Sequence, residues 1–483
     1  MQRSTGKAKA ILLQASVTVT GVIKGILLLK LIAGLGKEHY AFISQFLVIG
    51  MIGAQALMAG FDAPMVSDTA TQKSECAPDA LKLVILINLL GLCLLFLLAP
   101  EAIANFVWGD ASHSTEAMLL LAYIGVQGLS LTKLTQFQGE KKFSLYTRYQ
   151  MAQQLTQLAA IALTTWTGSI FYIVNAVILA ELTVWTLTSL LVPLAPFIGK
   201  PTTKEKLIWI KVNLRVALPL FASTLLIWII TNGGRLVAVD QTDLKTLAMY
   251  SSTLAIAVLS SALTNPLCTV FFPYLSAGKG KNKEDSQSNL EQAQSALLAT
   301  STLLSIGILC LARPAIDYLA GPSFYAGPLF TFLICAGYIF FAQSRIVGLY
   351  HSINGSSGAI FRIYCLGSIL FLAMAWLSSQ LIGINGIALS FALGCFMLFS
   401  LLMKIDRKPS FKHLKLTASR FLVALLTLYT ACYFDFSSFY TGIVGASLIS
   451  AAAMIILYAV ATTHEREVLN GMTSRLRAKL TKS

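Results

Sequence analysis

The chain has 483 residues, of which 56% are hydrophobic and only 12% are charged. A soluble protein of this length carries about twice that charged fraction, and its interior is too small for so much apolar surface. The formal net charge is +15, but the basic residues lie in short loops between apolar runs. This distribution argues against a nucleic-acid partner and predicts a protein whose main solvent is the lipid bilayer.

Apolar segments follow one another along most of the chain. A membrane-spanning helix needs about twenty predominantly apolar residues. On this basis we expect spans at 10–32, 39–60, 81–100, 116–137, 148–167, 170–194, 213–231, 247–275, 292–318, 327–349, 358–379, 384–403, 418–434 and 440–461. The sequence therefore predicts an all-α polytopic membrane protein with about fourteen transmembrane helices. The first run has no small-residue cleavage site, so we interpret it as a span rather than a removed signal.

Lysine and arginine are unequally distributed between alternate loops. Basic clusters such as Lys141 and Lys142, Lys279 to Lys283, and Lys404 to Arg420 fall on one side, whereas the opposite loops hold few basic residues. Because cytoplasmic loops carry the excess of positive charge, we expect both termini in the cytoplasm. The loops on the other face are too short for a catalytic domain.

The chain divides into two similar halves. We expect a six-helix lobe at 1–195, a cytoplasmic linker at 196–212 and a second six-helix lobe at 213–403. A basic loop with helices 13 and 14 would follow at 404–461, and a basic cytoplasmic tail at 462–483. Weak self-similarity supports this division, because Phe106-Val-Trp-Gly-Asp and Tyr318-Leu-Ala-Gly-Pro each follow the third span of a half.

Five local patterns carry a resemblance to a known family. They are Leu35-Gly-Lys-Glu-His-Tyr-Ala-Phe-Ile-Ser-Gln-Phe, Leu218-Pro219, Phe272-Pro-Tyr-Leu-Ser, Leu319-Ala-Gly-Pro-Ser-Phe-Tyr and Ile382-Gly-Ile-Asn-Gly-Ile-Ala. Together they resemble the Wzx-type polysaccharide flippases of the MOP superfamily over most of residues 10 to 403. These are packing and turn features, so they indicate fold more directly than cargo.

The resemblance implies a two-lobed, MATE-like transporter. It implies that the chain moves undecaprenyl-diphosphate-linked oligosaccharide, such as an O-antigen, capsule or exopolysaccharide repeat unit, across the bacterial inner membrane by alternating access. Its partners would then be the lipid-linked oligosaccharide, the bilayer, and the polymerase and chain-length proteins of the same pathway.

Two ionisable residues lie deep within predicted spans, where charge is costly and usually functional. Lys24 lies about 12 Å of helix from the outer end of the first span, which suits a cavity cation that attracts a pyrophosphate or an acidic sugar. Glu181 lies near the centre of the sixth span and is an ion-coupling candidate. The alternative for both is mutual neutralisation within the same half.

Polar side chains form a stripe on the fifth predicted span. Gln150, Gln153, Gln154 and Gln157 have the spacing i, i+3, i+4 and i+7, which places them on one helical face. Tyr123 and Gln127 share a face of the fourth span. Such groups suit either sugar hydroxyls lining a cavity or hydrogen bonds that join helices.

Three arginines complete the candidate substrate cavity. Arg148 and Arg345 lie near cytoplasmic helix ends, where they either form a basic vestibule or only follow the positive-inside rule. Arg235 lies at the outer end of the seventh span, after Asn232-Gly-Gly, where the family often has an acidic residue.

No motif for ATP binding, metal binding or nucleophilic catalysis is recognisable in the sequence. We therefore expect a transporter without a cofactor, rather than an enzyme. The alternatives are a MATE-type cation-coupled multidrug exporter, which Lys24 and Lys30 in the first span argue against, and a membrane polymerase or ligase of lipid-linked glycans, which the short outer loops argue against.

Overall fold

A computed structural model of the chain describes residues 20–192, 202–268, 283–405 and 411–460, apart from residues 22, 72–75, 141, 265–266, 354–355 and 435. Within these residues the regular structure consists of α-helices and short 3-10 helices, without a strand. Ten of the described helices are long and apolar enough to cross a membrane. The predicted all-α, multi-pass membrane class is therefore confirmed.

Each of these ten helices covers one of the predicted spans. They are α2 (Lys37–Met58), α4 (Ala77–Leu98), α6 (Ser114–Gly139), α8 (Ile170–Leu191), α9 (Thr203–Gln241), α12 (Lys283–Leu319), α13 (Pro328–Ile353), α14 (Ser357–Ile382), α15 (Ile384–Met403) and α17 (Phe439–Val460). Eight agree with the predicted bounds within about four residues, whereas α9 extends ten residues beyond both predicted ends and α12 begins nine residues early. The match follows from length, since a helix of about twenty apolar residues extends about 30 Å, the thickness of the hydrocarbon core.

The other four predicted spans are also helical where they are described. Residues 23–33 of the first span form a helix. The fifth span lies in α7 (Phe143–Thr164), whose glutamines make it more polar than the others. The eighth begins as α10 (Leu244–Ala257) and continues into the 3-10 helix η3 (Val258–Ser261), and the thirteenth lies in α16 (Phe411–Phe434).

The packing of the helices divides the chain into two compact units. The first unit contains Met1–Ala255, Asp317–Tyr325 and Tyr364–Ser390, and the second contains Ile256–Ile316, Ala326–Ile363 and Phe391–Ser483. The predicted lobes, 1–195 and 213–403, follow the order of spans along the chain and stay a prediction. The tail at 462–483 and residues 196–201 of the linker lie outside the described residues.

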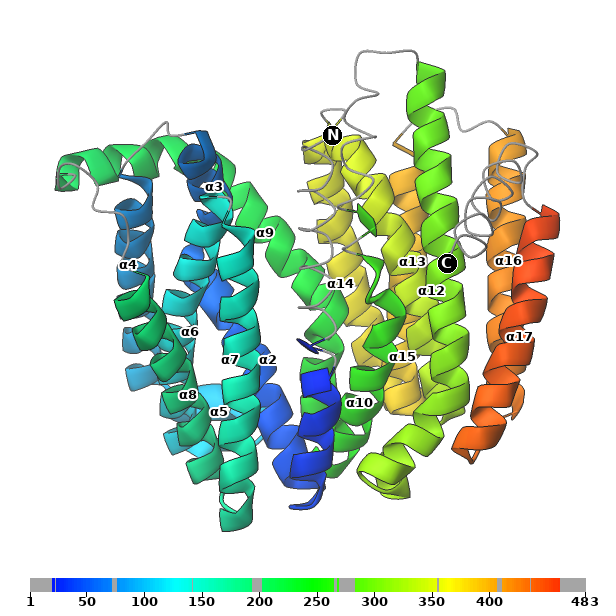
Figure 1. The fold of residues 1–483 in the computed structure, drawn as a ribbon, viewed down its shortest axis with the longest axis horizontal. Coiled ribbons are helices and arrows are strands. Elements are labelled where there is room, and N and C mark those ends of the chain that lie inside the picture. Colours follow the sequence, from blue (N-terminus) through cyan, green and yellow to red (C-terminus); the bar gives the residue numbers. More distant parts are fainter. Residues whose placement is uncertain are drawn as a thin grey trace, which may run out of the picture. The chain divides into compact units, whose positions relative to one another are not determined.

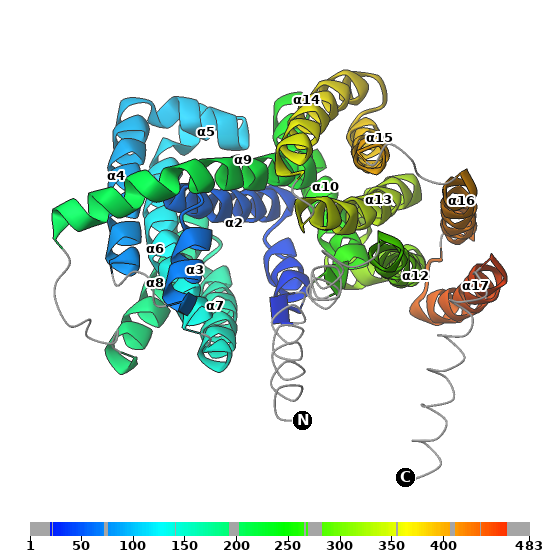
Figure 2. The same ribbon diagram turned by 90° about the horizontal axis from the view of Figure 1, so that it is seen from above.

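Helices α4, α6, α7 and α8 lie side by side in the first unit, each running opposite to the one before it in this order (Figure 1). Its longest helix, α9, begins at a capping box in which the Glu205 N–H donates to Thr202 Oγ1 and the Thr202 N–H donates to Glu205 Oε2. The first part of α9 runs across the ends of α3 (Asp62–Thr71) and α4, and the helix then passes beside α2 (Figure 2).

Aromatic packing joins α2 to its neighbours in the first unit. Phe42 stacks on Trp108 of the short helix α5 (Pro100–Trp108), with ring centroids 4.4 Å apart, and Phe46 packs against Tyr123 of α6 at 5.1 Å. In the second unit, Phe340 of α13 similarly stacks on Phe421 of α16 at 4.9 Å. Such ring pairs bury large apolar areas with defined geometry.

The turn between α2 and α3 requires a glycine. Gly60 has a φ of 78°, in the left-handed region, and a Cβ at this position would lie only 2.8 Å from the Phe221 backbone nitrogen on α9. A side chain there would be strained by its own backbone and would also push α9 away. The turn and α9 therefore approach one another this closely only because residue 60 lacks a side chain.

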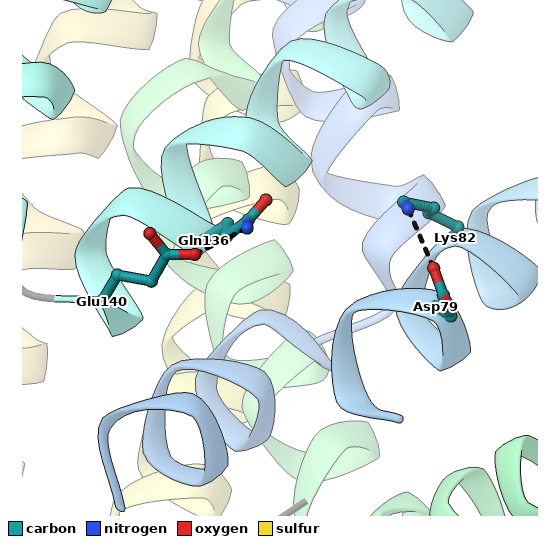
Figure 3. Close-up of polar contacts among 4 residues, drawn as sticks. All are labelled: Asp79, Lys82, Gln136 and Glu140. Atoms are coloured by element: carbon teal, nitrogen blue, oxygen red, sulfur yellow. Dashed lines mark hydrogen bonds and ion pairs between the residues drawn. The ribbon is translucent and has the colours of Figure 1, made fainter. Parts of the chain in front are cut away.

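Polar contacts gather where α4 begins and α6 ends (Figure 3). Lys82 Nζ lies 2.9 Å from Asp79 Oδ1, and the Gln136 side-chain amide donates to Glu140 Oε1 at 2.7 Å. Glu140 also pairs with Lys142 at 2.7 Å. Charged groups of this kind are stable at a water-facing end of a helix pair, so this end of the first unit lies outside the hydrocarbon core.

We expect Gly60→Ala to lower the apparent melting temperature of the purified protein in detergent by several degrees, because strain and the contact with α9 together cost about 1–3 kcal/mol. The matched control is Gly91→Ala, a helical glycine of α4 with no neighbouring atom within 4 Å of an added Cβ. The control should be neutral or slightly stabilising, since alanine favours a helix. Equal melting temperatures for the two variants would contradict this account.

The topology is tested at the two ends of α4, because Cys76 directly precedes the helix and Ser112 follows it beyond α5. In a variant that keeps Cys76 as its only cysteine, a membrane-impermeant maleimide should react only after the membrane is permeabilised. In a chain whose only thiol comes from Ser112→Cys, the same reagent should react with intact spheroplasts. The reverse pattern would overturn the predicted orientation.

Candidate functional site

A fully buried carboxylate lies at the centre of the candidate site. Glu181 on α8 is 0% exposed, and it accepts hydrogen bonds from the side-chain amides of Gln157, at 2.7 Å, and Gln153 on α7. The two glutamines are four residues apart, which places both amides on the face of α7 that packs against α8. These bonds replace the water that the carboxylate loses on burial.

Lys24 reaches the same carboxylate through an amide. Its ammonium donates to Gln157 Oε1, while Gln157 Nε2 donates to Glu181 Oε2. The amide oxygen therefore faces the cation and the amide nitrogen faces the anion, the arrangement of lowest electrostatic energy for an amide between opposite charges. Lys24 and Glu181 attract one another across this bridge.

Two residues of α6 complete the arrangement. Gln127 Oε1 accepts a hydrogen bond of 3.1 Å from Gln153, and buried Tyr123 lies beside Gln157 and Glu181. We call Lys24, Gln127, Gln153, Gln157 and Glu181 the Glu181 network. It joins the helical segment 23–33 with α6, α7 and α8, four elements of the first unit.

The other two glutamines of the predicted stripe lie apart from this network. Gln150 lines a cavity of about 220 Å³. Gln154 lies next to the first helix, where its Nε2 is 3.6 Å from the position of a Cβ added to Gly21, and its Oε1 has no hydrogen-bond partner. The four residues therefore have three different environments, although their spacing places them on one face.

Arg235 of α9 lies in a separate polar site of the first unit. It is 7% exposed, and its guanidinium donates to Ser44 Oγ at 2.8 Å and Ser251 Oγ at 3.0 Å. Within the part of the chain that the structure describes, no carboxylate lies within ion-pair distance of this group. Its charge is stabilised by hydroxyl dipoles, as expected from the missing acidic residue before Arg235.

The two remaining arginines are not part of the Glu181 network. Arg148 is exposed near the start of α7, and Arg345 is half-buried on α13, in the second unit.

Several residues that line the cavity with Gln150 are not among the predicted site residues, including Gln55, Asp62 and Tyr146. A signal for the first two was present: Gln55 is an amide within an apolar span, and Asp62 directly follows that span. Tyr146 gave no signal, because one tyrosine near a helix start is ordinary.

The Glu181 network can act as a charge relay. Adding a proton to Glu181 would remove the anion that orients Gln157, and an anionic ligand beside Lys24 would compete with Gln157 for the ammonium. A change at either charged group would alter the hydrogen bonds of the other, because Lys24 and Glu181 both bond to the side-chain amide of Gln157. A change of charge at Glu181 and the binding of an anion at Lys24 would therefore influence one another.

Comparisons with known proteins identify the fold and the family. The structure is similar to the lipid II flippase MurJ in an inward closed conformation, with a TM-score of 0.68 and 14% identity over 94% of this chain and 99% of that one. It is also similar to a multidrug resistance MATE family transporter, with a TM-score of 0.63 and 14% identity over 81% of this chain and 94% of that one.

A third similar structure is a MOP superfamily transporter from Pyrococcus furiosus, with a TM-score of 0.59 and 13% identity over 83% of this chain and 95% of that one. A search of curated protein sequences gives no match. The sequence model of the family described as "Polysaccharide biosynthesis protein" matches residues 32–326, more than half of the chain. The chain therefore belongs to this polysaccharide biosynthesis family and has the fold of MOP superfamily transporters.

Proposed function

We propose that the protein is a flippase that translocates undecaprenyl-diphosphate-linked oligosaccharide across the bacterial inner membrane by alternating access. The cargo would be a repeat unit of O-antigen, capsule or exopolysaccharide, and both termini would lie in the cytoplasm. The six-helix lobes at 1–195 and 213–403 would be the moving bodies, and the polymerase and chain-length proteins of the same pathway would be partners.

The observation that carries this proposal is a lysine within the helix bundle of a polysaccharide biosynthesis protein. Lys24 is half-buried and its charge is only indirectly compensated, through Gln157. Such a cation attracts a diphosphate strongly, because water screens the attraction poorly there. Arg148, Arg235 and Arg345 are proposed as further contacts on the path of the cargo.

Glu181 is proposed as the coupling group. A diphosphate at Lys24 would draw the ammonium away from Gln157 and leave the buried carboxylate less well compensated. A proton or another cation at Glu181 would then offset the loss. In this scheme Gln153 and Gln157 transmit the change, while Tyr123, Gln127, Gln150 and Gln154 line the polar interior.

A MATE-type multidrug exporter has the same fold, so the fold does not decide between the two functions. The family match and the charge of the first helix favour the flippase. Lys24 lies where a cationic drug would be repelled, whereas an anionic cargo would be attracted.

The function prediction concerns the whole pathway. Deleting the gene should abolish the surface polysaccharide and leave its lipid-linked repeat unit in the inner leaflet, where an impermeant glycan-binding reagent cannot reach it in spheroplasts. Expression of the intact chain should restore both. Normal surface glycan in a deletion strain that lacks a second flippase would contradict the proposal.

The site prediction concerns the charge of Lys24. Lys24→Arg should keep part of the transport, whereas Lys24→Glu should reduce it at least about 100-fold at equal protein abundance, because attraction for the diphosphate becomes repulsion. Transport is measured as the rate at which lipid-linked glycan becomes accessible in proteoliposomes. Lys30→Ala is the matched control, since Lys30 lies on the same helix with its ammonium at the Tyr318 carbonyl, and it should transport normally.

A double variant distinguishes cargo binding from simple neutralisation of Glu181. If Lys24 only neutralises the carboxylate, Lys24→Ala should lower membrane abundance, and Lys24→Ala with Glu181→Ala should restore abundance and transport together. If Lys24 binds cargo, the double variant should regain abundance but not transport. Recovery of both quantities would remove Lys24 from the cargo site.

A further inference from the structure

The cavity beside Gln150 lies within the first unit and is separate from the Glu181 network. It has a volume of about 220 Å³, and its walls come from the ends of α2 and α6, the start of α7, the turn before α3, and α9. The turn at Gly60 and the α9 residue Phe221 both line it. One wall of the cavity therefore lies where the turn at Gly60 packs closely against α9.

The charge of the cavity is the reverse of that at Lys24. Among its described lining residues none is basic, and the one ionised side chain is Asp62. This carboxylate lies in the first turn of α3. A phosphate group would be repelled here, so the cavity does not suit the diphosphate of a lipid-linked cargo.

The remaining polar groups of the cavity are amides and hydroxyls. Gln55, Gln138 and Gln150 contribute amides, and Gln150 Oε1 is buried without a hydrogen-bond partner. Thr135 donates its own hydroxyl proton to Leu131 O at 2.8 Å, so its oxygen is left as an acceptor. A buried acceptor without a partner is costly, and a ligand with several hydroxyl donors would satisfy it together with Asp62.

Apolar side chains alternate with these acceptors. Phe221, Met58 and Leu134 face the same space. A pyranose ring combines hydroxyl groups at its edge with C–H groups on its faces, and sites with a few placed polar groups among apolar and aromatic walls suit such a ligand. The cavity has room for one ring of this kind.

The position of the cavity relative to Lys24 agrees with the order of groups in a lipid-linked glycan. Gln150 lines the cavity and Gln157 binds Lys24, and both lie on α7. Seven residues are about two turns, or about 10 Å of helix. A cation for the diphosphate and a polar cavity without a basic residue thus lie about two helical turns apart, and in a lipid-linked glycan the first sugar is likewise attached directly to the diphosphate.

We propose that this cavity binds an uncharged sugar ring of the glycan, and that Asp62 selects against acidic sugars at this position. The proposal rests on the proposed function, because it assumes that the diphosphate lies near Lys24. Asp62 accepts hydrogen bonds from ring hydroxyls, Gln150 accepts another, and Phe221 packs on the ring face. A uronic acid would bring a second carboxylate next to Asp62.

The test uses the purified full-length chain in nanodiscs and three probes: citronellyl diphosphate, the same molecule bearing glucose, and the same molecule bearing glucuronic acid. The glucosyl probe should bind at least about tenfold more tightly than the glucuronosyl probe. Asp62→Asn should reduce this preference to within about threefold, mainly by strengthening the glucuronosyl probe, and should leave the affinity for citronellyl diphosphate unchanged.

Glu101→Gln is the matched control, since it removes a negative charge from an exposed site in the same unit, and it should keep the full preference. Melting temperatures verify that both variants are folded. The proposal is overturned if the wild-type chain binds both sugar probes equally, or if Asp62→Asn changes the affinity for all three probes by the same factor.

Two further measurements distinguish this proposal from the proposed function. If the diphosphate probes bind in a Lys24-dependent way without a sugar preference, the cavity proposal fails and the cargo proposal stands. If the diphosphate probes do not bind, but methyl glucoside binds and methyl glucuronide binds only to Asp62→Asn, the cavity proposal stands and the lipid-linked cargo is wrong. Absence of binding by every sugar probe overturns the cavity proposal.

Discussion

The cost of burying one carboxylate constrains the interior of the first unit. An uncompensated anion in a helix bundle costs several kcal/mol, so Glu181 requires donors on every side from which water is excluded. The structure supplies them from α7, whose two inward glutamines are one turn apart, and from Lys24 through Gln157. The packing of α7 against α8 and the position of the first helix are therefore linked electrostatically as well as sterically.

Helix α7 has an unusual composition because it serves two polar environments. Gln153 and Gln157 are turned to the carboxylate, whereas Gln150 borders the cavity that Asp62 also lines. A helix with so many amides is a poor membrane span by hydropathy alone, and it is stable here because its neighbours satisfy several of those groups. The same polarity allows one helix to contact the Lys24 and Glu181 charges and, about two turns away, the cavity that Asp62 lines.

The architecture could be predicted almost completely from the chain. Ten spans were located, eight of them within about four residues, because length and hydropathy decide what crosses a bilayer; the predicted bounds missed the ends of α9 and the start of α12, where the helices continue past the apolar segment. Transporters of the same fold share only 13–14% of their residues with this chain. Low identity is compatible with a shared fold because many different apolar sequences can form the same helix arrangement. The compact units could not be predicted in this way, because each of them combines segments that lie far apart in the chain.

The sequence by itself determined that Lys24 and Glu181 are buried in one membrane protein, and that four glutamines follow one helical stripe. Periodicity shows which residues share a face, but not what that face meets. Only the tertiary structure decided that Gln157 lies between the two charges, that Gln150 turns to a separate cavity, and that Asp62 joins it there. The physical reason is that hydrogen bonds depend on distances of tenths of an ångström between helices, which hydropathy does not encode.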